Sequence, residues 1–336
     1  MREHRQLRTR QLGATGPTVS ALGLGAMGMS DFYGPADEAE SRATIEAALE
    51  AGITLIDTGD FYGMGHNEML IGETLKGAKR DKAILSVKYG AQRTPEGHFI
   101  GIATDPAATK TALAYTLKRL RVDYIDIYRP ARVSPLVPIE DTVGAIADLV
   151  KAGYVRHIGL SEAGADTIRR AHKVHPIVDL QIEYAMITRG VEREILPTLR
   201  ELGIGMTAYG VLSRGLISES ALAGGSTGGF RSSHSPRFMG ENLDKNLALV
   251  RALKAIADAK GCSVAQLAIA WAAQRGDDIV PLIGARKRER LAEAIGALEV
   301  TLTADELARI DQAAPPEAVA GDRYDAAQMT MLDSER

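Results

Sequence analysis

The 336-residue sequence lacks several features that would assign it to a specialised class of protein. Its one cysteine, Cys262, excludes an intramolecular disulfide and is typical of a reducing compartment. No run of about 18 apolar residues occurs, so a transmembrane helix is not expected. The N-terminal segment MREHRQLRTRQLG is charged and lacks the apolar stretch of a secretory signal.

The net charge of the chain is small and slightly negative. A formal charge of -3 and a pI near 6.2 give no reason to expect nucleic acid or an anionic membrane as partner. His172 and His175 share a helix face but have no acidic neighbour in the sequence, so no metal site is expected. We therefore expect a cytoplasmic protein with a small-molecule ligand; a homo-oligomer is possible, but no feature of the sequence supports one.

Short apolar runs alternate with longer helical patterns along most of the chain. Strands are expected at 19–24, 53–57, 83–87, 124–128, 155–160, 177–181, 204–208 and 279–283. Helices are expected near 37–51, 66–78, 106–120, 139–152, 164–174, 191–202, 241–259 and 287–297. Because such strands are apolar on both faces, they indicate parallel pairing under a layer of helices. Eight repeats of this unit predict a (β/α)8 TIM barrel.

The barrel is expected to form a single α/β domain over residues 1–336, with additions. These are an N-terminal extension, a long Gly- and Ser-rich loop at 218–240 after the seventh strand, and an extra helix and tail after Thr303. The segment GLGAMG at 23–28 matches the Gly-rich fingerprint of a dinucleotide-binding fold. However, the next helix cannot begin before about Asp37, so a tight loop at the barrel rim is the better interpretation.

Three polar residues follow the ends of neighbouring expected strands. Asp57 ends the second strand, Tyr62 lies in the loop after it, and Lys88 ends the third strand. The carboxyl ends of barrel strands face the same side, where catalytic groups are found. A free phenol titrates near 10, and a lysine within ~4–6 Å lowers this pKa by favouring the phenolate. The combination is therefore suited to a tyrosine that donates a proton near neutral pH.

Several segments resemble the aldo-keto reductase superfamily in sequence and order. They include LIDTGDFYG, SVKYG, VDYIDIYR, LVKAGYVRHIGLSE, LQIEYAMITR and PLIGARKRERLAEAIGAL, and the resemblance extends from about Gln11 to Asp333. It is strongest to the branch that includes the potassium-channel β-subunits and pyridoxal reductase. The resemblance implies a (β/α)8 barrel that binds NADP(H) and reduces a carbonyl, with Tyr62 as general acid, Lys88 lowering its pKa and Asp57 holding Lys88.

The resemblance also implies a cofactor site. Tyr209 would stack on the nicotinamide, Ser161 and Gln181 would bind its carboxamide, and Arg286 and Arg290 would bind the 2′-phosphate. The other implied cofactor contacts are Gly25, Met27, Asp57, Gly210, Leu212, Arg214, Gly284 and, near the adenine, Glu293. Glu162 stands where the family usually has an asparagine.

The family's catalytic histidine is replaced here by Ala131 in the segment YRPARVSP. Three interpretations stay open: Arg129 or a substrate group supplies the missing hydrogen bond, the enzyme is slow and narrow, or catalysis is lost and NADPH is bound for another purpose. Pyridoxal is a candidate substrate because the yeast pyridoxal reductase group is similar here. The expected substrate-pocket residues are Phe32, Phe61, Tyr89, Arg129 and Ala131. A phosphosugar isomerase or lyase on the same barrel is a further alternative.

Overall fold

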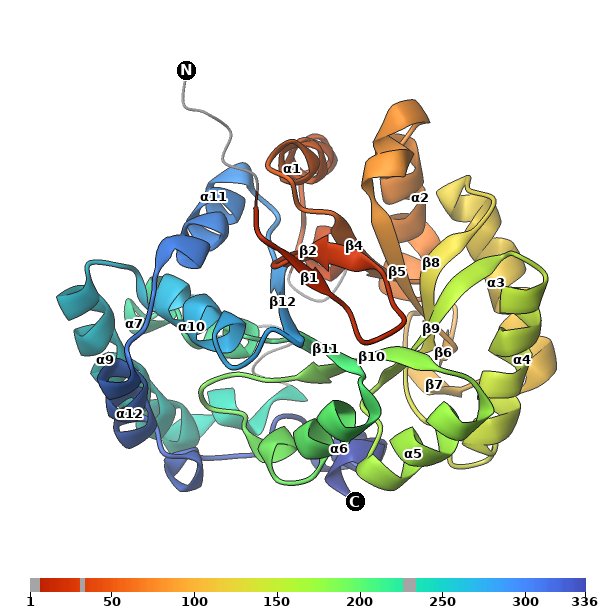
Figure 1. Ribbon diagram of the computed structural model, residues 1–336. Coiled ribbons are helices and arrows are strands. Elements are labelled where there is room, and N and C mark those ends of the chain that lie inside the picture. Colours follow the sequence, from red (N-terminus) through yellow and green to blue (C-terminus); the bar gives the residue numbers. More distant parts are fainter. Residues whose placement is uncertain (1–6, 31–33, 226–233) are drawn as a thin grey trace.

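Eight parallel strands close into a barrel at the centre of the computed structural model, which describes residues 7–30, 34–225 and 234–336 (Figure 1). In sequence order the barrel strands are β3 (Gly23–Gly25), β4 (Leu55–Gly59), β5 (Ile84–Tyr89), β8 (Ile125–Pro130), β9 (Val155–Ser161), β10 (Ile177–Glu183), β11 (Gly205–Tyr209) and β12 (Ile279–Gly284). Strand β12 pairs with β3, which closes the cylinder. The predicted (β/α)8 barrel is confirmed.

Helices surround the barrel. They are α1 (Glu38–Glu50), α2 (His66–Thr74), α3 (Pro106–Leu120), α4 (Ile139–Lys151), α5 (Ala165–Val174), α6 (Ile195–Leu202), α9 (Gly240–Lys260), α10 (Val264–Ala273) and α11 (Arg288–Gly296). The extra C-terminal helix is α12 (Ala304–Ala313), and short helices α7 (Glu219–Leu222) and α13 (Ala326–Met329) lie in the loop after β11 and in the tail. Residues 226–233 of the predicted long loop lie outside the described residues.

Local sequence signals explain several helix boundaries. Asp105 accepts hydrogen bonds from two backbone N–H groups at the start of α3, and Pro106 occupies the first helical position. Ser263 and Gln266 form a capping box at the start of α10. Gly203 ends α6 with a φ of 67°, a conformation that costs glycine little.

The expected first strand at 19–24 is wrong as a single element. Residues Thr18–Ser20 form β2, which pairs antiparallel with β1 (Thr9–Gln11), and only Gly23–Gly25 enters the barrel. The hairpin lies across the amino-terminal end of the barrel, in front of the strands in Figure 1. Its apolar side chains join a small core with inward-facing strand residues. This core consists of Leu12, Val19, Leu55, Ile127, Val178 and Val280. A second hairpin, β6 (Ala91–Arg93) and β7 (Phe99–Ile102), was not predicted.

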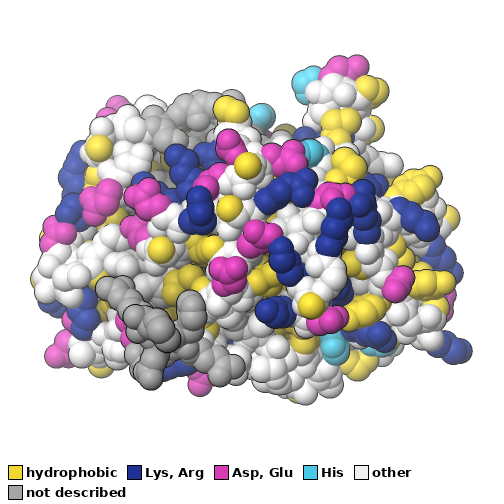
Figure 2. Space-filling model, turned by 90° about the horizontal axis from the view of Figure 1, so that it is seen from above, with side chains coloured by type: hydrophobic (Ala, Val, Ile, Leu, Met, Phe, Trp, Pro, Cys, Tyr) yellow, Lys and Arg dark blue, Asp and Glu magenta, His cyan; other side chains and the backbone are white. Residues whose placement is uncertain are grey.

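The helical side that carries α1 and α11 has a mixed surface. Figure 2 shows basic and acidic side chains interspersed on one side of the molecule. Arg288 of α11 pairs with Glu40 of α1 at 2.9 Å, and Arg42 pairs with Glu38 at 2.6 Å. In the described part of the chain, no helix is long and apolar enough to cross a membrane.

Candidate active site

Asp57 and Lys88 form a buried ion pair at the carboxyl-terminal end of the barrel. They lie on adjacent strands, β4 and β5, where Lys88 is in register with Gly59. The Lys88 ammonium donates to Asp57 Oδ1, and neither side chain is more than 6% exposed. Burial lowers the pKa of Lys88, and the adjacent Asp57 carboxylate opposes this change. The structure thus brings two residues of the predicted catalytic set into direct contact.

Tyr62 lies beside this ion pair. The Lys88 Nζ atom is 5.2 Å from the centre of the Tyr62 ring, and Tyr62 is buried. Phe61, an expected pocket residue, packs edge-on against Tyr62 with 4.7 Å between ring centroids. After Tyr62 the chain turns sharply, with a positive φ of 53° at Met64, before helix α2 begins. The phenol is therefore held between the ammonium and an aromatic neighbour.

Gln181 on β10 and Ser86 on β5 support the ion pair through hydrogen bonds. Gln181 accepts a hydrogen bond from Lys88 at 2.7 Å and donates one to Asp57 at 2.7 Å. Ser86 donates to Asp57 Oδ2 at 2.8 Å. A neutral amide carries two N–H donors and two oxygen lone pairs, so Gln181 retains one of each. This capacity is compatible with its expected contact to a carboxamide.

Arg129 lies inside the barrel and not at the position expected for a substrate-binding residue. Its fully buried guanidinium donates to Asp179 at 2.9 Å, Ser86 at 2.9 Å and the Leu160 carbonyl at 3.2 Å. Asp179 also accepts from Thr207 at 2.6 Å. The expectation that Arg129 lines the substrate pocket and replaces the missing histidine is wrong, because this interior network holds its terminal nitrogens.

Tyr89 faces the helices. Its ring stacks on that of Tyr128 with 4.4 Å between centroids, and its hydroxyl is 2.8 Å from Thr109 Oγ1 on α3. Because successive strand side chains point to opposite faces, the inward position of Lys88 turns Tyr89 outward. The expectation that Tyr89 lines the substrate pocket is wrong. Another expected pocket residue, Phe32, lies outside the described residues.

Ala131 and Arg132 follow β8 at the same end of the barrel. The Ala131 N–H donates to the Tyr89 carbonyl at 2.8 Å, and its side chain is buried. Arg132 is half-buried and donates from Nη1 to the Ala131 carbonyl at 2.7 Å. The guanidinium carbon of Arg132 is 6.0 Å from the centre of the Tyr324 ring. A cation therefore stands next to Ala131, the position where the sequence predicted that a histidine is replaced.

Glu162, just after β9, binds the C-terminal segment. Arg323 donates to both of its carboxylate oxygens, at 3.0 and 2.7 Å. Tyr209 and Ser334 also donate to Glu162, each at 2.7 Å. Burial alone would raise the pKa of Glu162, but the Arg323 guanidinium outweighs it and holds this pKa at about 2. Glu162 also has a positive φ of 51°, which is unusual for a residue other than glycine.

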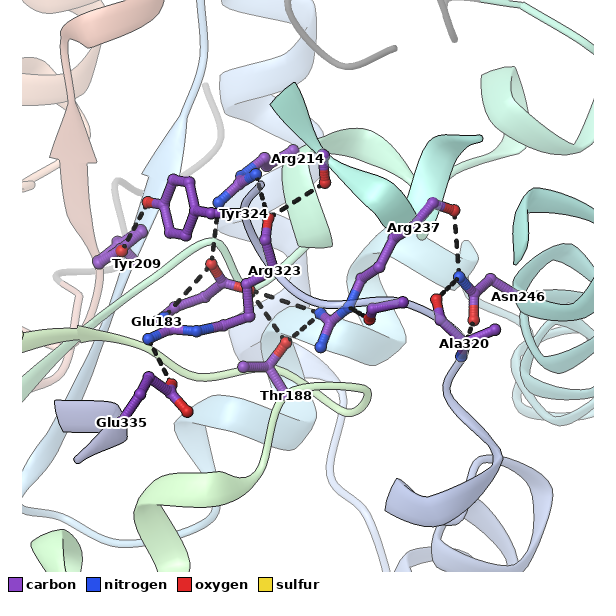
Figure 3. A network of polar contacts seen from close by, with 12 residues as sticks. Glu183, Thr188, Tyr209, Arg214, Arg237, Asn246, Ala320, Arg323, Tyr324 and Glu335 are labelled. Carbon is purple, nitrogen blue, oxygen red and sulfur yellow. Dashed lines mark hydrogen bonds and ion pairs between the residues drawn. The ribbon is translucent and has the colours of Figure 1, made fainter. Parts of the chain in front are cut away.

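Tyr324 and Arg214 extend this contact, as Figure 3 shows. The hydroxyls of Tyr324 and Tyr209 are 3.1 Å apart, and the Arg214 guanidinium lies 3.9 Å from the Tyr324 ring centre. Arg214 also donates to the Arg323 carbonyl at 2.5 Å and to Glu183 at 3.4 Å. The structure therefore directs the Arg214 side chain to the C-terminal segment, although the sequence predicted a cofactor contact.

Two buried hydroxyls at this end have no hydrogen-bond partner among the described residues. They are Ser161 Oγ at the end of β9 and Ser213 Oγ after β11. The loop around Ser213 has positive φ at Gly210 (67°), Ser213 (47°) and Arg214 (58°), and Leu212 is half-buried within it. Unpaired buried hydroxyls and left-handed residues other than glycine are rare and cluster at binding sites. These groups fit a polar cofactor that passes along the strand ends.

The remaining expected cofactor residues lie near α11. Arg286 donates to the carbonyl oxygens of residues 34–35, each at 3.2 Å. Arg290 is exposed and donates to Glu293 at 2.9 Å, and Glu293 accepts from Ser263 at 2.7 Å. Two cations thus lie at the start of a helix, where the backbone dipole favours phosphate.

Three small or flexible residues lie on the rim between these parts. Gly25 of β3 is in register with Gly284 of β12 on one side and with Asp57 of β4 on the other. Met27 is half-buried and begins a short 3-10 segment directly after β3. The ends of β12, β3 and β4 therefore form a continuous edge from the start of α11 to the Asp57–Lys88 pair.

Two acidic residues near Tyr62, the half-buried Asp60 and the buried Glu68, were not predicted to interact. Burial raises the pKa of Asp60 to about 7, with a further contribution from the neighbouring Glu68. Asp60 accepts from the Gly90 N–H at 3.2 Å, and the fully buried Glu68 pairs with Arg119. Burial likewise raises the pKa of Glu68. This cluster lies directly next to the loop that carries Tyr62.

Sequence reasoning also missed the supporting residues of the barrel interior. A signal for them was present, because polar residues recur at every second position of otherwise apolar strands. The missed residues are Ser86 on β5, two positions before Lys88, and Asp179 and Glu183 on β10, two positions to either side of Gln181. A period of two places such residues on one face of a strand. No comparable signal marks Arg323, which is far from Glu162 in sequence.

Comparison with known proteins agrees with this geometry. Residues 21–315 match the model of the aldo/keto reductase family. The chain is 41% identical over 322 residues to probable aldo-keto reductase 1 of Glycine max, covering 95% of this chain and 92% of that protein. The chain belongs to the aldo/keto reductase family.

Solved structures of the family have the same architecture. The glycerol dehydrogenase of Gluconobacter oxydans superposes with a TM-score of 0.81 at 25% identity, over 92% of this chain and 96% of that one. An aldo-keto reductase of Bacillus halodurans, solved in a holo form, gives 0.77 at 28% identity, over 93% and 97%. Family membership makes the chain an oxidoreductase of the carbonyl-reducing type, and the family generally uses nicotinamide cofactors.

Proposed function

We propose that this aldo/keto reductase uses NADPH to reduce an aldehyde or ketone to an alcohol, with Tyr62 as the general acid. The observation that carries this proposal is the grouping of Tyr62 with the buried Asp57–Lys88 pair at the carboxyl ends of β4 and β5.

Each residue of the group has a defined task. When bound, the nicotinamide supplies a hydride to the carbonyl carbon, and negative charge then develops on the carbonyl oxygen. Tyr62 donates a proton to that oxygen, and the Lys88 ammonium 5.2 Å from its ring centre stabilises the resulting phenolate. Asp57 and Gln181 hold the ammonium in place through their hydrogen bonds to Nζ.

The residues present fit a nicotinamide dinucleotide phosphate. Ser161 offers an unpaired buried hydroxyl to the carboxamide, and the loop around Ser213 offers another to the pyrophosphate. Arg286 and Arg290 at the start of α11 suit the 2′-phosphate, because guanidinium groups bind phosphate oxygens through paired hydrogen bonds. This feature favours NADPH over NADH.

The substrate side is shaped by Ala131. Its methyl group leaves more room than the family's histidine would, and it cannot donate a hydrogen bond to the carbonyl oxygen. A bulky ring aldehyde such as pyridoxal is therefore our candidate substrate. Loss of one donor to a developing oxyanion typically lowers the rate by about 10²–10³-fold, so small aldehydes should be poor substrates.

The decisive experiment removes only the phenolic hydroxyl. Tyr62→Phe should abolish NADPH consumption with pyridoxal and with a panel of other carbonyl compounds, because the proton donor is lost. NADPH should still bind, as a fluorescence titration would show, because Tyr62 is not needed to hold the cofactor. Retention of turnover in this variant would refute the role of Tyr62.

A second function is favoured by the absence of the histidine. A chain that binds NADPH without turning over any carbonyl would act as a nicotinamide-dependent regulatory subunit. In that case the same carbonyl panel would give no turnover with the wild-type protein, although NADPH would bind tightly. Turnover of any member at a rate that Tyr62→Phe abolishes decides for the enzyme.

A further inference from the structure

Arginine side chains are concentrated where the C-terminal segment meets the carboxyl end of the barrel. They are Arg132, Arg214, Arg237 and Arg323. Three of them are paired with carboxylates, in the ion pairs Arg214–Glu183, Arg237–Glu183 and Arg323–Glu162. Arg323 reaches Glu335 as well, at 2.7 Å. Among residues 7–30, 34–225 and 234–336, no carboxylate oxygen forms an ion pair with Arg132.

The surroundings of Arg132 place it at the active site. The charge on its guanidinium influences the pKa of Lys88, which Arg132 helps to lower, and the pKa of Glu162. Burial lowers the pKa of Arg132, but nearby Tyr324, Tyr209 and Glu162 outweigh this and raise it, while Arg323 opposes them. Arg132 therefore lies near three residues of the candidate site. They are the proposed catalytic Lys88, Glu162 next to Ser161, and Tyr209, which is expected to stack on the nicotinamide.

The hydrogen-bonding capacity of Arg132 is largely unused. A guanidinium has five N–H donors, and Arg132 gives one hydrogen bond, to the Ala131 carbonyl. A half-buried cation without a carboxylate is costly unless an anion arrives to pair with it. The planar fork of arginine matches the two oxygens of a carboxylate or phosphate. Among the described residues, Arg132 is thus a cation at this site that forms no ion pair with a carboxylate.

We propose that Arg132 is a substrate-binding residue and that the substrate is a carbonyl compound that also carries a carboxylate or phosphate group. The inference rests on the proposed reductase function and names its substrate class. Ala131 removes the bulk of an imidazole beside Arg132, so the anionic group can reach the guanidinium while the carbonyl oxygen lies at Tyr62. Substrate charge then determines specificity.

Matched substrates test this inference. We would measure kcat/KM for 4-carboxybenzaldehyde against 4-methylbenzaldehyde, and for glyceraldehyde 3-phosphate against glyceraldehyde, with the wild type, Arg132→Gln and Arg132→Lys. A hydrogen-bonded charge pair supports a preference of about 10- to 100-fold for the anionic member. Arg132→Gln should remove this preference, because kcat/KM on the anionic members should fall about 10- to 100-fold further than kcat/KM on the neutral members. The carboxylate and phosphate pairs show separately which anion is preferred.

Arg156→Gln is the matched control. Arg156 also lies over a tyrosine ring, 4.2 Å from the centre of Tyr124, but near the start of β9 at the opposite end of the barrel. Arg156→Gln should leave the preference for anionic aldehydes unchanged. An equal loss on neutral and anionic aldehydes in Arg132→Gln would overturn the inference, because Arg132 would then serve the carbonyl or the fold. A wild-type enzyme without a preference for anions would overturn it too.

The inference about Arg132 can also be tested if the protein has no reductase activity. Binding of 4-(hydroxymethyl)benzoate, an expected product, can be compared with that of 4-methylbenzyl alcohol by calorimetry in the presence of NADP. Tighter binding of the anion that Arg132→Gln abolishes supports the inference without any turnover. Equal binding of the two alcohols overturns the inference, whereas the Tyr62→Phe experiment alone decides the reductase function.

Discussion

The C-terminal segment is held by a buried ion pair whose removal should have a large effect on stability. In Arg323→Met, Glu162 loses both guanidinium hydrogen bonds, and its side chain has no exposure to water. Removing one partner of a buried ion pair costs about 3–5 kcal/mol, because the other charge is left unpaired. The lowering of the pKa of Glu162 to about 2, in which Arg323 is the largest favourable contribution, is of the same order. We therefore expect a loss of about 3 kcal/mol at neutral pH.

Urea unfolding of the wild type and the variant measures this loss. Because the folded pKa of Glu162 is depressed, its stabilisation is present above pH 4.5 and is lost as the pH falls toward 2. The difference between the two proteins should shrink over that pH range. Hydrogen exchange reports the same event locally, since residues 320–336 should lose protection if the segment detaches before the barrel unfolds.

A matched control and a double variant make the prediction sharp. Arg200 also pairs with a carboxylate, Asp278, at 2.8 Å, but these side chains are 48% and 29% exposed. Arg200→Met should therefore cost no more than about 1 kcal/mol. Glu162→Gln combined with Arg323→Met should recover part of the loss, because the unpaired charge is gone. The reasoning is refuted if Arg323→Met costs as little as Arg200→Met and leaves hydrogen exchange of the segment unchanged.

Two further predictions concern the acidic cluster and the cofactor. Because burial raises the pKa of Asp60 to about 7, the folded state binds a proton that the unfolded chain releases near pH 4, so stability should fall as pH rises from about 4 to 7. Asp60→Asn should flatten this pH profile and stabilise the protein at pH 8 by on the order of 2 kcal/mol; parallel unfolding profiles would contradict it. Replacing Arg286 and Arg290 by alanine should weaken NADPH binding about 10- to 100-fold in a fluorescence titration while NADH binding changes little. Equal losses for both cofactors would argue against a 2′-phosphate site at α11.

Much of the barrel follows from local sequence, but the positions of its side chains only partly do. Apolar runs and helix caps such as Asp105 predict the order of strands and helices. The same alternation that turns Lys88 inward would have turned Tyr89 outward, so that error was avoidable. The failure at Arg129 was different. Its inward position was predictable, but its partner Asp179 lies two strands further along the chain, and only the closed barrel brings them together.

The contact between Glu162 and Arg323 in the C-terminal segment could not be predicted from local sequence patterns. Glu162 and Arg323 are separated by 161 residues, and no periodicity links them. The sequence showed only that a carboxylate stands where the family usually has an asparagine. In the folded chain this carboxylate instead accepts hydrogen bonds from Arg323, Tyr209 and Ser334. A charge buried at such a site has to find a counter-ion, but the sequence does not say which of many arginines it is.

The two departures from the family pattern have a common consequence for recognition. Glu162 already accepts hydrogen bonds from Arg323, Ser334 and Tyr209, so in the proposed function the carboxamide of a bound nicotinamide would depend on Ser161 and the remaining capacity of Gln181. The Ala131 side chain has no hydrogen-bond donor, so in the proposed mechanism Tyr62 would be the group that donates a proton to the carbonyl oxygen. With fewer fixed contacts on both cofactor and carbonyl, correct placement of the substrate requires binding energy from elsewhere on the molecule. Arg132 is a cation at this end of the barrel whose remaining N–H donors, counted against the described residues, can supply it.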